Sequence, residues 1–433
     1  MMRICGVAVI MLCAMLVITG VALAKPTSWE MDNGLTVIME ENHLVDIVAL
    51  EVFQRGGVLY EEEENAGITR LLARSLDKGT KYRDAAEIAA AFDDLGAALS
   101  VQLLPDMTCV SLRAPGETFL SALAILAEIL IEPVFPQKEI ERERALLIED
   151  IRRSRDEPFV ALYDSFRETF YRDHPYRLAE SGGEEAVSTL TREDLVDFYR
   201  RHWVGENTVI SLVGNFETEL MREKLTEYFS AMSEVSAPEF LSLPEKPPSQ
   251  IQRVAEDVAM HSSWLMVGYP APPADHPDYA AMRVINALLG HGGSSRLFLE
   301  VRGRRGLAYS AFSFYPTRMH PSHLASYAVV EPGKEEEALR AMQKVIEGLK
   351  EELVKEGEIA RARNIVIGEH LLAQETRAGR AWRLGWMETM SRGYDYVDTL
   401  ADEAEDVDAQ VIQRVAREYF NVPSIVVRGP GGG

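Results

Sequence analysis

The chain has 433 residues, of which 47% are hydrophobic, and its formal net charge is −23 at pH 7. This length exceeds what one ordinary core holds, so two or more domains are expected, and the apolar content is ample to build them. So acidic a balance argues against nucleic acid or an anionic membrane as the main partner, and it suits basic peptides better.

Residues 1–24 have the layout of a secretory signal peptide. Arg3 precedes an uncharged apolar run, and Ala22-Leu23-Ala24 resembles a small-residue cleavage site. We therefore expect a mature chain that starts at Lys25, lies in the periplasm and has no membrane attachment. The alternative is an uncleaved anchor, because the apolar run is long enough to span a bilayer.

The first half of the mature chain alternates between strand and helix signals. Strands are expected at 34–41, 46–53, 98–104, 107–114 and 207–215, where β-branched residues are frequent. Helices are expected within 66–80, between 84 and 96, at 117–131, at 137–156 and from 191 onward. Asp84 with Glu87 and Thr191 with Asp194 have the spacing of capping boxes at two of these helix starts.

The order of elements repeats in the second half. EIERERALLIED at 139–150 is echoed by EIARARNIVIGE at 358–369. Prolines collect between the halves, which suits a semi-rigid linker at 233–250 that separates domains at 25–232 and 251–433. We expect an α+β fold of two similar domains, each with a mixed or mostly antiparallel sheet packed with helices.

The helix within 66–80 carries Arg70 and Arg74 four residues apart, so the two side chains lie on one face. Like charges in this arrangement repel. For an isolated arginine pair a solvated surface is the simpler interpretation. Motifs elsewhere in the chain suggest another interpretation of this arginine pair.

LLGHGGSSRLFLEVRGRRGLAYSAFSFY at 288–315 closely resembles the stretch around the paired arginine and tyrosine of insulinase-like (pitrilysin-type) zinc peptidases. NGLTVIMEENH at 33–43, the helix before DKGT, and ERERALLIEDIRRSRDEP at 141–158 resemble the N-terminal domain of the same family, in the same order. The resemblance covers essentially the whole mature chain.

Active members of this family carry an inverted zinc motif, H-x-x-E-H, on the helix before K-G-T, and a carboxylate ligand on a later helix. Alignment places the first histidine on Arg70, the glutamate on Ala73 and the second histidine on Arg74; the later ligand falls on Asp150. Guanidinium has no lone pair to donate, and alanine cannot act as a general base. We therefore expect no zinc or other cofactor in this chain.

We further expect Arg70 and Arg74 to pair with Asp150 or its neighbour Glu149, so that an ion-pair cluster replaces the metal. The substrate-lining edge strand of the family has Asn where this chain has Ser100, a second departure from the pattern.

The resemblance retains one functional pair. Arg302 and Tyr309 in VRGRRGLAY have the family's spacing, and in the family this pair contacts the substrate or its developing oxyanion. The structural alternative places Arg302 in a surface cluster and Tyr309 in the core. That surface cluster would contain Arg296, Arg304 and Arg305.

Other candidate residues have simpler interpretations. Pro321 breaks the helix on which His320 and His323 would have to converge on a metal. Cys109, the only cysteine outside the leader, is expected to be a buried inert thiol. We expect Glu369 and His370 to be solvated or packed, and the glycine-rich run at 290–293 lacks the lysine and spacing of a phosphate loop.

Some bacterial members of the family occur as paired chains, one with H-x-x-E-H and one without. The sequence resembles the second type, which implies a heterodimer with a zinc-bearing chain and unfolded peptides as substrates. A structural or peptide-binding assembly subunit is the alternative. An active enzyme with a different metal site is a third interpretation, which the histidines do not favour.

Overall fold

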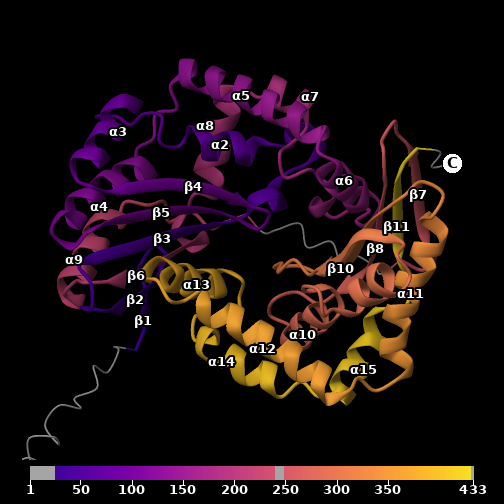
Figure 1. Cartoon of the computed structure of the whole chain (residues 1–433). Helices are drawn as coiled ribbons and strands as arrows, with labels where there is room; N and C mark the ends of the chain where they lie inside the picture. Colours follow the sequence, from indigo (N-terminus) through magenta and orange to yellow (C-terminus); the bar gives the residue numbers. More distant parts are fainter. Residues whose placement is uncertain (1–24, 239–247, 431–433) are drawn as a thin grey trace, which may run out of the picture.

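The computed structural model describes residues 25–238 and 248–430. The predicted leader at 1–24 and residues 239–247 of the predicted linker lie outside the described residues. A six-stranded sheet uses strands from residues 27–214, and a five-stranded sheet uses strands from 252–429 (Figure 1). The predicted α+β fold with mostly antiparallel sheets is confirmed.

The first half contains six strands and a larger set of helices. Its strands are β1 (Thr27–Glu30), β2 (Thr36–Glu41), β3 (Ile47–Arg55), β4 (Ala98–Leu104), β5 (Met107–Pro115) and β6 (Thr208–Gly214). Its α-helices are α2 (Ile68–Ser75), α3 (Ala85–Asp94), α4 (Gly116–Ile131), α5 (Gln137–Arg155), α6 (Pro158–Phe170), α7 (Glu184–Thr189), α8 (Arg192–His202) and α9 (Thr218–Phe229).

The second half follows the same plan. Its strands are β7 (Gln252–Asp257), β8 (Ser263–Ala271), β9 (Ala308–Phe314), β10 (Ser322–Val330) and β11 (Ser424–Gly429). Its helices are α10 (Tyr279–Gly290), a π-helix η5 (Phe298–Arg304), α11 (Glu335–Glu351), α12 (Glu356–Leu372), α13 (Arg377–Thr389), α14 (Tyr396–Glu405) and α15 (Ala409–Tyr419).

The two sheets show that the halves are duplicates. The strand order β2-β6-β3-β5-β4 corresponds to β7-β11-β8-β10-β9, and β1 is an extra edge strand in the first sheet. In both sheets the first pair of this order is parallel and the following pairs are antiparallel. The echoed segments at 139–150 and 358–369 lie on the equivalent helices α5 and α12.

Local signals predicted the helix starts well. Both expected capping boxes are present, with Asp84 accepting from the Glu87 amide and Thr191 from the Asp194 amide. Strand β3 is buried along nearly its whole length because both of its faces are covered, by α4 on one side and α13 on the other. Among the described residues, no helix combines the length and the apolar character needed to cross a membrane.

Each half lends a helix to the sheet of the other half. Helix α13 packs on β3 and β6 of the first sheet, and α6 packs on β8 and β11 of the second (Figure 1). Glycines permit both close approaches: a Cβ on Gly385 would lie 2.4 Å from Ser211 Oγ, and a Cβ on Gly268 would lie 2.1 Å from Phe166 Cζ. This exchange fixes the halves against each other through packing.

Candidate functional site

Helix α2 carries the positions that resemble a metal site. It packs against α5, which supplies the acidic positions, and against the edge strand β4. Ala73 is buried, whereas Arg70 and Arg74 are only partly buried, so the two guanidinium groups reach the boundary between protein and solvent.

Arg74 lies between two carboxylates of α5. Its Nε is 3.0 Å from Glu143 Oε2, and its Nη1 is 2.7 Å from Asp150 Oδ2. The hydrogen bond from Arg74 lowers the pKa of the Asp150 carboxyl below its usual range. The expected pairing of Arg74 with Asp150 is therefore present. Glu143 was missed, although its spacing of seven residues from Asp150 places both on one helix face.

Arg70 does not join this cluster. Its Nε donates to the backbone carbonyl oxygen of Glu180 at 2.8 Å, and burial lowers its pKa. Glu149 is exposed and has no ion pair with another described residue. The expected contacts of Arg70 and Glu149 are thus wrong, because Arg70 turns toward the segment after α6 and Glu149 faces away from α2.

The side chains at these positions do not fit a zinc ion. A catalytic zinc needs about three deprotonated donors and an open position. Here Arg74 is a fixed cation that already occupies an oxygen of both Glu143 and Asp150. Across the described residues, no group of three or more His, Cys, Asp or Glu could hold a metal. A cofactor-free chain remains a prediction.

Arg302 and Tyr309 lie together at the surface of the second half. Arg302 comes from the π-helix η5 and Tyr309 from β9, and the Arg302 Cζ lies 5.4 Å from the Tyr309 ring centroid. The same guanidinium lies 4.9 Å from the Phe298 ring centroid. Tyr309 is 80% exposed, so the core alternative for this tyrosine is wrong. Short π-helices are frequent at functional sites.

The neighbouring arginines behave differently from Arg302. Arg304 and Arg305 both bind Glu300, at 3.1 and 2.8 Å, and Arg296 binds Glu358 at 2.8 Å. Arg302 forms no ion pair with any described residue. A cation and a phenol side by side, both exposed, can donate hydrogen bonds to a carbonyl oxygen or an oxyanion.

Ser100 lies in β4, which ends the six-stranded sheet and pairs only with β5 in the described part of the chain. Ser100 is exposed, as are Ala98 and Gln102 on the same face. Within residues 25–238 and 248–430, no hydrogen bond or ion pair joins this strand or the α2 arginines to Arg302 and Tyr309. The two groups of predicted site residues are therefore separate within one chain.

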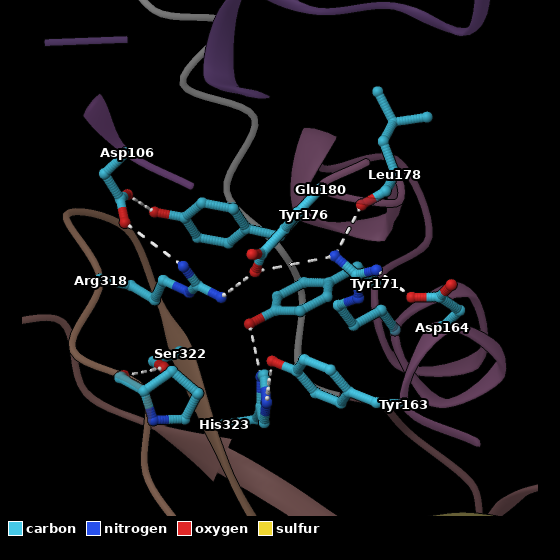
Figure 2. Close-up of polar contacts among 12 residues, drawn as sticks. Asp106, Tyr163, Asp164, Tyr171, Tyr176, Leu178, Glu180, Arg318, Ser322 and His323 are labelled. Carbon is cyan, nitrogen blue, oxygen red and sulfur yellow. Dashed lines mark hydrogen bonds and ion pairs between the residues drawn. The ribbon is translucent and has the colours of Figure 1, made fainter. Parts of the chain in front are cut away.

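A buried polar network, not anticipated from the sequence, joins the two halves (Figure 2). Arg318, from the β9–β10 connection, lies 3.7 Å from Asp106 Oδ2 and 3.3 Å from Glu180 Oε1. The Tyr176 hydroxyl donates to the other oxygen of Asp106. Arg318 is 6% exposed and Asp106 is 1% exposed, so these two opposite charges lie together away from water.

The other residues considered from the sequence, His323, His370 and Cys109, contribute to packing and internal hydrogen bonding. His323 has both ring nitrogens engaged, with Nδ1 2.8 Å from the Tyr171 hydroxyl and Nε2 3.1 Å from the Tyr163 hydroxyl. The ring nitrogen Nε2 of His370 contacts the carbonyl oxygen of Val397 at 2.7 Å. Cys109 is buried as expected, and burial raises the pKa of its thiol.

Glu51 is a buried carboxyl in the middle of β3. One oxygen accepts from the Ser111 hydroxyl and lies 3.4 Å from Cys109 Sγ; the other has no hydrogen-bond partner among the described residues. Burial raises the pKa of Glu51 to about 7, although the hydrogen bonds from Ser111 and Cys109 oppose the rise. The side chain is therefore protonated below neutrality.

This pKa predicts a pH-dependent penalty on folding. In the unfolded chain the Glu51 carboxyl ionises near pH 4.5. The stability that the protonated Glu51 side chain gives the folded state is therefore fully present below pH 4.5 and is lost as the pH rises to about 7. We expect Glu51→Gln to raise the free energy of unfolding at pH 8 by about 2 to 3 kcal/mol relative to the native chain. Below pH 4.5 the difference should vanish.

Urea unfolding of both chains at a series of pH values measures this difference. The exposed Glu30 provides a matched control, since Glu30→Gln should change stability little at any pH. A Glu51→Gln difference that is constant from pH 4.5 to 8 would contradict the prediction.

Comparison with known proteins agrees with this architecture. Residues 36–181 match the family model "Insulinase (Peptidase family M16)", and residues 189–366 match "Peptidase M16 inactive domain". An uncharacterized zinc protease of Rickettsia felis is 27% identical over 93% of this chain and 97% of its own length. The uncharacterized zinc protease YmxG of Bacillus subtilis is 24% identical over 90% of this chain and 94% of its own length.

Solved structures give the same result for the fold. A protease from Helicobacter pylori superposes with a TM-score of 0.87 at 22% identity, covering 94% of this chain and all of that one. A peptidase M16 inactive domain from Pseudomonas fluorescens has the same TM-score and identity, covering 94% and 98%. The fold is thus that of a two-domain, metallopeptidase-like protein. The chain belongs to the insulinase family of peptidases, and residues 189–366 match the family's inactive domain.

Proposed function

We propose that this chain is the non-catalytic subunit of a heteromeric, periplasmic insulinase-family peptidase. It would supply Arg302 and Tyr309 to a partner chain that carries the zinc motif and degrades peptides. The observation that carries the proposal is the contrast between two sets of positions. Arg302 and Tyr309 are present and exposed, whereas the metal-ligand positions hold Arg70, Ala73 and Arg74.

The geometry supports a contribution in trans. Arg302 has no ion pair with a described residue, so its charge is available to a substrate carbonyl or an oxyanion in a partner's site. The separation between these residues and α2 within the chain fits a contribution to another subunit. Extended peptides would bind by strand addition, for which the edge strand β4 with Ser100 is suited.

The second candidate is a structural or peptide-binding assembly subunit with no role in proteolysis. The names of the relatives, zinc proteases of uncharacterized function, favour the peptidase complex. The acidic composition fits basic peptide substrates. The expected periplasmic location rests on the signal-like residues 1–24.

Peptide cleavage and zinc content test the proposal directly. The mature chain would be assayed alone and mixed with a relative that carries H-x-x-E-H. We expect neither cleavage nor zinc in this chain alone. In the mixture we expect zinc and a turnover above that of the relative alone. Equal turnover of the relative with and without this chain would favour the assembly subunit, and zinc-dependent cleavage by this chain alone would overturn the proposal.

A further inference from the structure

The guanidinium of Arg70 has donors that no described residue uses. Glu180, Glu61 and Asp150 act on its charge, but none of them lies within ion-pair distance of it. It uses Nε for the carbonyl oxygen of Glu180, and its two terminal nitrogens form no hydrogen bond or ion pair with a described residue. The side chain is only partly buried. A guanidinium keeps its charge in such a place, and its two terminal nitrogens match the geometry of a carboxylate.

The buried carboxylate of Glu61 forms no ion pair with Arg70. Glu61 lies close enough to raise the pKa of Arg70, but its two oxygens accept the backbone N–H groups of Gly67 and Thr69 at 2.8 and 3.0 Å. Those hydrogen bonds hold Glu61 at the start of α2. Its oxygens are therefore used for the helix terminus.

The carboxylates of Asp150 and Glu180 are paired with other cations. Asp150 binds Arg74 through Oδ2 and Arg153 through Oδ1. The side chain of Glu180 lies 3.3 Å from Arg318 in the network between the halves. Each acidic neighbour therefore already has a partner, and a further carboxylate from outside would find donors at Arg70.

The position of Arg70 suggests what would bring that carboxylate. Helix α2 packs against β4, whose outer edge is unpaired within the described residues. An extended peptide that adds to β4 gains main-chain hydrogen bonds from the strand but no charge recognition, since the exposed face of β4 presents Ala98, Ser100 and Gln102. Arg70 is a cation on the helix beside this edge.

We propose that the former metal-site helix now binds peptide carboxylates, with Arg70 as the anchor for a C-terminal or side-chain carboxylate of a peptide lying along β4. This rests on the strand addition to β4 in the proposed function and adds the side chain that recognises the peptide; it needs neither a partner chain nor cleavage. The contact would be a charge-assisted, two-point hydrogen bond. Such contacts change affinity by roughly 10-fold or more when the charge is partly desolvated.

Fluorescence anisotropy on the mature chain alone tests the proposal with three labelled ten-residue peptides of one Val/Thr/Ser sequence. The first has a free C-terminus, the second is amidated, and the third is amidated with one internal Glu. We expect a peptide with a carboxylate to bind about 10-fold more tightly than the amidated one. Preference for the first or the third peptide identifies the source of the carboxylate.

Variants assign this preference to one side chain. Arg70→Gln should abolish it, Arg70→Lys should keep part of it because the charge remains, and Arg222→Gln, a matched charge loss on exposed α9, should leave it intact. Equal affinity of the native chain for all three peptides, or no binding, would overturn the proposal. So would a full preference in Arg70→Gln. Loss of cleavage by the complex, with the preference retained, would count only against the proposed function.

Discussion

Arg302→Ala is expected to lower the peptide turnover of the complex with the zinc-bearing partner by about 100- to 1,000-fold, which is the usual cost of removing one oxyanion donor. Assembly should survive, because Arg302 is exposed and lies against the rings of Phe298 and Tyr309. Steady-state kinetics of the purified complex, with gel filtration to verify assembly, measure both results.

Two matched variants sharpen this test. Arg304→Ala removes a neighbouring arginine that is paired with Glu300, and it should leave turnover within a few fold of the native complex. Tyr309→Phe keeps the ring beside Arg302 but loses the hydroxyl, so it should lower turnover without disturbing the local fold. Unchanged turnover in Arg302→Ala would refute the role assigned to this pair.

The second large effect is expected on stability. Arg318→Met should lower the free energy of unfolding by about 3 to 5 kcal/mol, because it keeps the bulk of the side chain but leaves Asp106 and Glu180 without their shared cation. Burial already raises the pKa of Asp106, and loss of the arginine would raise it further. Urea unfolding at pH 7 measures the loss.

The control for Arg318 is a surface ion pair. Arg253 and Glu336 are both exposed, so Arg253→Met should cost at most about 1 kcal/mol. Adding Asp106→Asn to Arg318→Met should recover part of the loss, since the second change removes the stranded charge. Equal costs for Arg318→Met and Arg253→Met would show that the network does not stabilise the junction.

Local sequence signals predicted the elements because their causes are local. The capping boxes at Asp84 and Thr191 each join residues only three positions apart in the sequence. The duplication could also be predicted from the sequence, since the equivalent helices α5 and α12 have similar sequences. The exchange of α6 and α13 could not be predicted, because it depends on close contacts between a helix of one half and the sheet of the other, at Gly385 and Gly268.

By itself, the sequence determined which chemistry the degenerate site lacks. Arginine and alanine cannot donate lone pairs to zinc whatever their geometry, so Arg70, Ala73 and Arg74 exclude the family's metal motif at this helix. Arg302 and Tyr309 were identified from the matching run around them at 288–315, and their role stays a prediction. Side-chain type, and not position in space, decides that the metal motif is absent.

Only the tertiary structure decided the partners of the charged groups. Arg74 binds Glu143 as well as Asp150, Arg70 turns to the Glu180 carbonyl, and Arg318 meets Asp106 from the other half of the chain. Several carboxylates compete for each guanidinium, and the differences among such pairings are small compared with the packing energy that sets the positions of helices and strands. Packing therefore chooses the ion pairs, and residues distant in sequence meet only after the two halves have joined.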